Sequence, residues 1–88
     1  MIADVRALAL RRRILPDGLD RLGDDDDLWE KGLSSFACLD WMLAIEEAFE
    51  IEFPQAAITR DGFRSIAAVT RAVDRLIAAS ARDWRAAA

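Results

Sequence analysis

Histidine is absent from this 88-residue chain, which has a single lysine, Lys31, and a single cysteine, Cys38. A serine nucleophile needs a neighbouring base, most often histidine, to take its proton. Because we expect Lys31 to be solvated, serine hydrolase chemistry carried by the chain alone is disfavoured. One cysteine cannot form an internal disulfide or a cysteine and histidine metal cluster. We therefore expect no catalytic residue, no metal site and a half-buried, structural role for Cys38.

The chain also lacks length and long apolar runs. Its 88 residues, 53% of them apolar, suffice for one small core, and no run is long enough to span a membrane. The segment 1–4 lacks the basic and apolar pattern of a secretory signal. We expect one domain over 1–88, with a core over about 2–79, a C-terminal tail over about 80–88, and a cytoplasmic location.

Positive charge is scarce at the centre of the chain. The net charge is −4, with acidic residues dominant over 20–52 and arginines at 11–13 and 60–85. A nucleic-acid-binding protein usually has a net positive charge and a coherent basic face. The pattern therefore disfavours nucleic acid and favours a partner with a basic docking surface. The four aspartates at 24–27 lack the alternating spacing of a calcium loop and predict a solvated loop.

Helical periodicity predicts an all-α fold. Apolar residues at helical spacing indicate a first helix over about 2–13, which the turn at 16–18 would stop. A long loop over about 15–33 follows. It carries recurring leucines and Trp29, so we expect it to be packed against the core.

A second helix is expected to begin at Ser34 or Ser35, either of which can serve as its N-cap, and to end at 49 or 50. Its inward face would be formed by Cys38, Trp41, Ile45 and Phe49. Acidic residues would occupy the outward face (Asp40, Glu46, Glu47 and Glu50). Three apolar residues, Phe36, Leu39 and Leu43, lie at the boundary, as in a docking surface or, alternatively, at the edge of an ordinary core.

The remaining chain predicts two further helices. Residues 51–54 end in proline and favour an extended connector over a strand. A short helix is expected over about 55–59. The last helix would begin after the N-cap Ser65. The sequence thus predicts three main helices, one short helix and a long loop between the first two main helices.

These segments, in this order, resemble the acyl and peptidyl carrier protein family. Residues 27–36 are similar to the family's acidic loop, glycine-leucine pair and modified serine. Residues 44–54 resemble its second helix and connector, and 63–66 the start of its final helix. The resemblance covers about 15–79 and implies a four-helix bundle.

The resemblance implies that Ser35 carries 4′-phosphopantetheine, attached covalently from coenzyme A, whose thiol holds an amino acid or acyl group as a thioester. Ser35 stands three residues after Gly32, as in the family, which favours it over Ser34 as the modified residue. The family nearly always has aspartate where this chain has Ser34. No base is required on the carrier, because the attaching transferase would supply the catalysis.

The resemblance also implies partners and a docking surface. Phosphopantetheinyl transferase, an amino acid:[carrier protein] ligase or other acyl-loading enzyme, and a downstream acceptor enzyme would engage a monomeric carrier, without nucleic acid or membrane. The docking residues would be Phe36, Leu39, Asp40, Leu43 and Glu47. Residues 36–68 resemble most closely the stand-alone bacterial aminoacyl carriers. The alternatives are a free-standing carrier in polyketide or nonribosomal peptide synthesis and an unmodified helical protein-interaction module.

Overall fold

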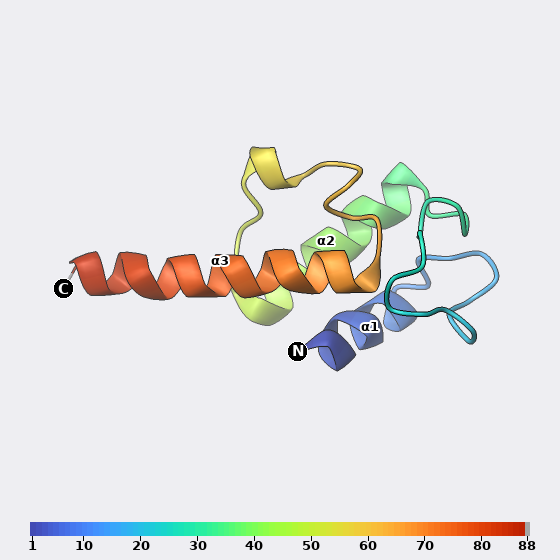
Figure 1. Cartoon of the computed structure of the whole chain (residues 1–88), viewed down its shortest axis with the longest axis horizontal. Helices are drawn as coiled ribbons and strands as arrows, with labels where there is room; N and C mark the ends of the chain where they lie inside the picture. Colours follow the sequence, from blue (N-terminus) through green and yellow to red (C-terminus); the bar gives the residue numbers. More distant parts are fainter. Residues whose placement is uncertain (88) are drawn as a thin grey trace.

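The computed structural model describes the backbone of residues 1–87 and the side chains of residues 1–80. In this part, the chain forms α1 (Ile2–Arg11), α2 (Ser35–Phe49), the 3-10 helix η1 (Gln55–Ala57) and α3 (Ile66–Ala87), with no strand (Figure 1). The predicted all-α fold, with three main helices and one short helix, is confirmed. The expected tail over 80–88 overlaps the end of α3, and the side chains of 81–88 lie outside the described residues.

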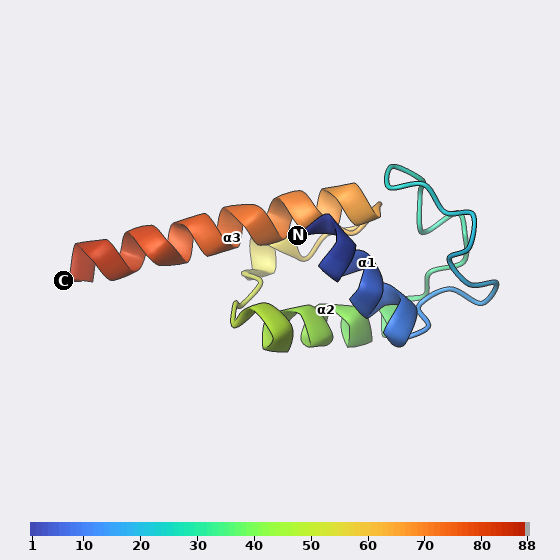
Figure 2. The ribbon, with the colours of Figure 1, turned by 90° about the horizontal axis from the view of Figure 1, so that it is seen from below.

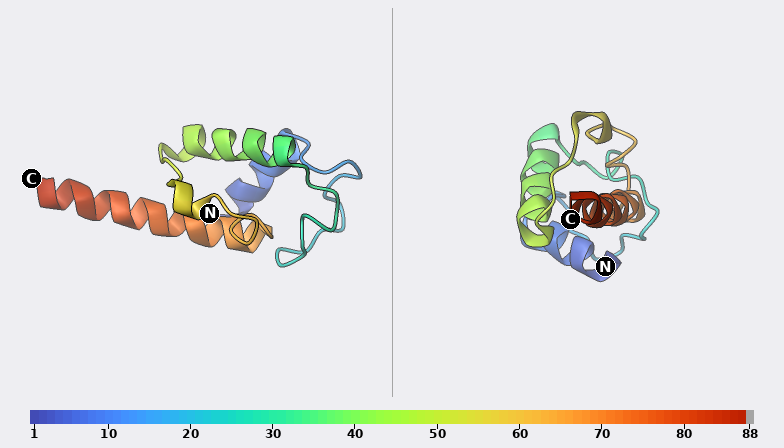
Figure 3. Two further views of the ribbon diagram at one scale, coloured as in Figure 1. Left: turned by 90° about the horizontal axis from the view of Figure 1, so that it is seen from above. Right: turned by 90° about the vertical axis from the view of Figure 1, so that its left-hand side faces the viewer.

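The helices α2 and α3 begin at the same end of the molecule and run in the same general direction, and α1 packs against both (Figures 1 and 2). The long loop over 12–34 folds across that end (Figure 3). Two backbone hydrogen bonds join it to the start of α3: Leu28 N–H donates to Arg64 O (2.7 Å) and Ala67 N–H to Asp24 O (2.9 Å). The loop that leads into α2 is therefore tied to the start of α3.

The core lies between the three α-helices and is filled by Trp41. This side chain is fully buried. Its Nε1–H donates to the backbone carbonyl of Val5 (3.3 Å), and its ring meets the edge of Phe63 with the ring centroids 6.2 Å apart. The loop leucines are packed as predicted: Leu15, Leu19 and Leu28 are buried. The long loop is consequently part of the core.

The first helix ends two residues earlier than predicted. Arg13 adopts a left-handed backbone conformation (φ 51°), which residues other than glycine and asparagine rarely adopt. Its N–H donates to Leu10 O and the next N–H, of Ile14, donates to Ala9 O. These two bonds satisfy the last helical carbonyls and turn the buried Ile14 into the core, so the helix stops before Pro16 is reached.

The later elements follow the sequence pattern closely. Ser65 caps α3, because its Oγ accepts the Ala68 backbone N–H (3.0 Å). Residues 51–54 form an extended connector that buries Phe53. None of the helices in residues 1–87 combines the length and apolar character that crossing a membrane requires.

Candidate functional site

A glycine turn and a serine cap set the start of α2. Gly32 has φ +105°, a conformation that side-chain-bearing residues rarely adopt, and a Cβ here would lie 3.0 Å from Pro16. Two residues later Ser34 adopts an extended conformation, and its Oγ accepts the Ala37 backbone N–H (3.0 Å). The Ser34 hydroxyl is thus the helix N-cap, which confirms one of the two caps considered from the sequence.

Ser35 is the first residue of α2 and is exposed. The Ala37 N–H is bonded to the Ser34 side chain and the Cys38 N–H to the Ser34 carbonyl (2.9 Å). The backbone N–H groups of Ser35 and Phe36 come earlier in the helix and therefore have no acceptor within it. An anionic group on Ser35 would therefore meet the positive end of the helix dipole.

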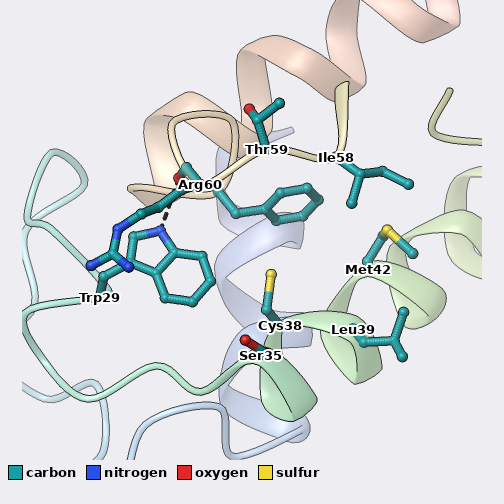
Figure 4. Close-up of a pocket in the computed structure, with 9 residues that line it drawn as sticks. Trp29, Ser35, Cys38, Leu39, Met42, Ile58, Thr59 and Arg60 are labelled. Carbon is teal, nitrogen blue, oxygen red and sulfur yellow. Dashed lines mark hydrogen bonds between the residues drawn. The ribbon is translucent and has the colours of Figure 1, made fainter. Parts of the chain in front are cut away.

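The Ser35 side chain borders a pocket of about 410 Å³ between α2 and the loop that precedes α3 (Figure 4). Cys38, Leu39 and Met42 complete the α2 side. The opposite side is formed by residues distant in sequence: Trp29, Ile58, Thr59, Arg60 and Phe63.

Trp29 and Arg60 are joined in two ways at one end of this pocket. The Trp29 Nε1–H donates to the Arg60 carbonyl oxygen (2.8 Å). The Arg60 guanidinium carbon lies over the indole, 5.1 Å from the ring centroid, in a cation–π contact. Neither residue was singled out as a site residue from the sequence. The only sequence signal for this contact was the apolar residue Trp29 in a loop that is rich in polar residues.

Cys38 lies in the first turn of α2 beside Ser35 and is half-buried, as predicted. Burial penalises the thiolate and raises the pKa of the Cys38 thiol to about 11. A thiol with this pKa is almost wholly protonated near neutral pH, so Cys38 is a poor nucleophile in the native fold.

The outward face of α2 exposes three large apolar side chains at spacings of three and four residues. Phe36 is 82% exposed, Leu39 50% and Leu43 52%. This spacing aligns them along one stripe of the helix. Because half or more of each side chain reaches solvent, they are exposed surface residues and not part of the buried core.

The acidic residues of α2 divide into two kinds. Glu47 is exposed beyond the apolar stripe. Asp40 pairs with Arg12 at the end of α1, with Nη1 and Oδ1 3.6 Å apart, and Glu46 accepts the Phe53 backbone N–H (2.8 Å). The acidic face is retained, since Asp40 stays partly exposed, and two of its carboxylates also contact other segments.

Three of the four aspartates over 24–27 contact other parts of the chain. Asp24 pairs with Arg6 (2.6 Å), and Asp26 accepts the Gly23 N–H (2.8 Å). Asp27 accepts the N–H groups of Trp29 and the following residue. The loop is exposed at Asp24 and Asp25, as predicted, and the carboxylates that accept backbone N–H groups also fix its turns. Within the described residues, no cluster of three or more acidic or cysteine side chains is arranged to hold a metal ion.

Comparison with known proteins identifies the family. No family model matches the chain. The aminoacyl carrier protein of Agrobacterium fabrum is 42% identical over 77 residues, which cover 88% of this chain and 93% of the relative.

Two solved structures share the fold. A carrier protein from Agrobacterium tumefaciens, crystallised with an engineered Bradyrhizobium japonicum glycine:[carrier protein] ligase and AMP, is 43% identical. It superposes with a TM-score of 0.78 over 84% of this chain and 99% of its own. A solution structure from Agrobacterium tumefaciens is 40% identical with a TM-score of 0.74, each chain being fully covered. The chain belongs to the aminoacyl carrier protein family.

Proposed function

We propose that Ser35 is the attachment site of 4′-phosphopantetheine and that the chain carries an amino acid on this arm. The observation that supports Ser35 most directly is that the side chains of the two serines have different contacts. The Ser34 hydroxyl accepts the Ala37 N–H as the N-cap, whereas the Ser35 side chain borders the pocket at the start of α2. Replacing Ser35, the proposed modified serine, would therefore leave the N-cap of α2 in place.

The residues around Ser35 fit such an arm. The backbone N–H groups of Ser35 and Phe36 and the helix dipole favour a phosphodiester at this end of α2. Apolar side chains on both sides of the adjoining pocket, among them Met42 and Phe63, suit the methyl and methylene groups of pantetheine. When bound, the group supplies a thiol that holds the amino acid as a thioester.

The chain's part in attachment is to present the serine oxygen. That oxygen forms a bond to the phosphorus of coenzyme A that bears pantetheine. The pyrophosphate P–O bond breaks, adenosine bisphosphate leaves, and the serine proton passes to a base of the phosphopantetheinyl transferase. No histidine is needed on the carrier, which agrees with its absence from the sequence. The protein is proposed to act as a carrier and not as an enzyme.

The partner that loads the arm is proposed to be an amino acid:[carrier protein] ligase. The support is the relative crystallised with a glycine:[carrier protein] ligase, together with the exposed stripe on α2. We define the α2 docking surface as Phe36, Leu39, Asp40, Leu43 and Glu47. Its apolar centre and acidic edge suit an enzyme surface with apolar hollows and arginines. A downstream acceptor enzyme would bind the same α2 docking surface. The carrier is proposed to be monomeric and cytoplasmic.

The decisive experiment is an intact-mass spectrum after incubation with coenzyme A and a broad-specificity phosphopantetheinyl transferase. The native chain and Ser34→Asn should each gain one phosphopantetheine, since asparagine preserves the N-cap without a hydroxyl. Ser35→Ala should gain none. If the addition disappears with Ser34→Asn and persists with Ser35→Ala, the site is Ser34. If the native chain gains nothing while a control carrier in the same tube is modified, the protein-interaction module replaces this proposal.

A further inference from the structure

The wall of the pocket opposite α2 is held in place by contacts between its own residues. The Trp29 indole is held by its hydrogen bond to the Arg60 carbonyl, and the guanidinium lies over its ring. Thr59 fixes the same loop, because its Oγ1 accepts the Gly62 N–H (3.0 Å) and its carbonyl accepts the Phe63 N–H (3.2 Å). An indole held by two contacts to a loop that is itself fixed is a preformed surface for a ligand to pack against.

The attachment point and this wall belong to the same pocket. Ser35 and Trp29 both line it, and Figure 4 shows the Ser35 hydroxyl on the side of the pocket where the indole lies. A group bonded to Ser35 therefore starts at the edge of the pocket and can reach its lining without a separate binding event. Its effective concentration there is high, so even a weak contact with the indole would be well populated.

The charge that lines the pocket is positive only. Among the described residues that line the pocket, Arg60 is the one charged side chain, and no carboxylate is present. Two carboxylates in the adjoining loops have other partners: Asp61 pairs with Arg64 (2.9 Å), and Asp27 accepts the Trp29 backbone N–H (2.9 Å). A cation that entered the pocket would find no carboxylate in its lining and would be repelled by Arg60, whose guanidinium lies over the indole.

We propose that the pocket binds the pantetheine arm of Ser35 against Trp29 when the arm is unloaded, and that an amino acid on the arm opposes this binding. The inference rests on the proposed function. A free thiol is neutral and enters an apolar pocket at little cost. The α-ammonium group of an aminoacyl thioester is a cation and is repelled beside Arg60, so the loaded arm moves into solvent. Loading would thereby expose the cargo to the next enzyme.

The test follows the indole N–H resonance of Trp29 by nitrogen-15 NMR in four forms of the full chain. These are the unmodified protein, the protein with the free-thiol arm, and two proteins whose arms end in glycyl or acetyl groups. Coenzyme A analogues with an amide in place of the thioester provide the last two in stable form. Trp29→Phe assigns the resonance, and the buried Trp41 provides an internal reference that should not move.

The free-thiol and acetyl arms should shift the Trp29 resonance from its position in the unmodified protein. The glycyl arm should return it most of the way. In Arg60→Gln, the glycyl arm should shift the resonance further than it does in the native chain. This variant preserves the backbone carbonyl that Trp29 contacts, and the exposed side chain can be replaced without disturbing the core.

Two results would overturn the inference. One is a Trp29 resonance that is the same with and without the free-thiol arm, and the other is an equal response to glycyl and acetyl arms in the native chain. The intact mass of each sample shows whether the arm is present. A failure of attachment, which would contradict the proposed function, is therefore distinct from a failure of the arm to enter the pocket.

Discussion

The carboxylate of Glu46 accepts the backbone N–H of Phe53 at 2.8 Å, which ties the connector after α2 to the helix itself. Phe53 is buried and its ring packs on Phe63 with the centroids 5.4 Å apart. A charged acceptor for a partly buried N–H therefore fixes the connector at the point where it enters the core.

Glu46→Ala should lower the free energy of unfolding by about 1–3 kcal/mol, because it leaves the Phe53 N–H without its charged acceptor. Glu47→Ala, the next residue, should leave stability almost unchanged, since Glu47 is exposed. Urea unfolding followed by circular dichroism distinguishes the two. Equal stabilities for both variants would show that the bond to the connector contributes nothing.

Ser34→Asp should accelerate arm attachment. The family nearly always has aspartate at this position, and the carboxylate can still accept the Ala37 N–H as an N-cap. It would also give the transferase the negative charge that it meets on other carriers. The rate of mass increase at limiting transferase measures this effect, and Ser34→Asn is the neutral control. A rate no faster than that of the native chain would show that the missing carboxylate does not limit modification.

The parts of the site that depend on local helix geometry could be predicted from the sequence. Capping preference limits the N-cap to Ser34 or Ser35, and periodicity places Phe36, Leu39 and Leu43 at the edge of the outward face. The choice of Ser35 as the modified residue comes from the family resemblance. The pocket could not be predicted, because it requires Trp29 and Arg60, 31 residues apart, to meet through the packing of two loops. No local pattern encodes that meeting.

The same reasoning explains two contacts and one helix end that the sequence did not predict. Periodicity places Asp40 and Glu46 on the outward face of α2, but it does not show that Arg12 and the Phe53 N–H lie within their reach. The end of α1 was missed because Arg13 has no intrinsic preference for a left-handed conformation. There the two backbone hydrogen bonds and the burial of Ile14 outweigh the local preference.

Leu39→Ala and Leu43→Ala should each raise the KM of the loading ligase for the carrier. A truncated interface residue of this kind typically costs about 1–2 kcal/mol, or about 5–30-fold in affinity. Stability should change little, because both side chains are half-exposed.

Leu10→Ala provides the matched control, since Leu10 is 59% exposed but lies on α1. Steady-state loading with radiolabelled amino acid gives the kinetics. Asp40→Asn tests the charged edge of the same surface, and Arg12→Ala shows whether the contact with α1 contributes to it. Unchanged KM values for both leucine variants would remove these residues from the docking surface.

Cys38 should remain unreactive while the thiol of the arm is modified. Burial raises the pKa of Cys38 from 9.0 to about 11, so its thiolate fraction near pH 8 is about 100-fold below that of an unperturbed thiol. Iodoacetamide at this pH should add once to the arm-bearing protein, on the arm, and only slowly to the unmodified protein. Peptide mapping by mass spectrometry identifies the modified sulfur.

The pH dependence follows from the sign of this shift. A thiol with a raised pKa in the folded state contributes stability that is complete below pH 9 and is lost as the pH rises towards 11. Alkylation of Cys38 in the unmodified protein should therefore increase steeply over this interval, and the protein unfolded in urea should react fast already at pH 8. Fast alkylation of native Cys38 at pH 8 would contradict its burial. It would also give the chain a second nucleophile beside Ser35, able to take the cargo from the arm by thioester exchange.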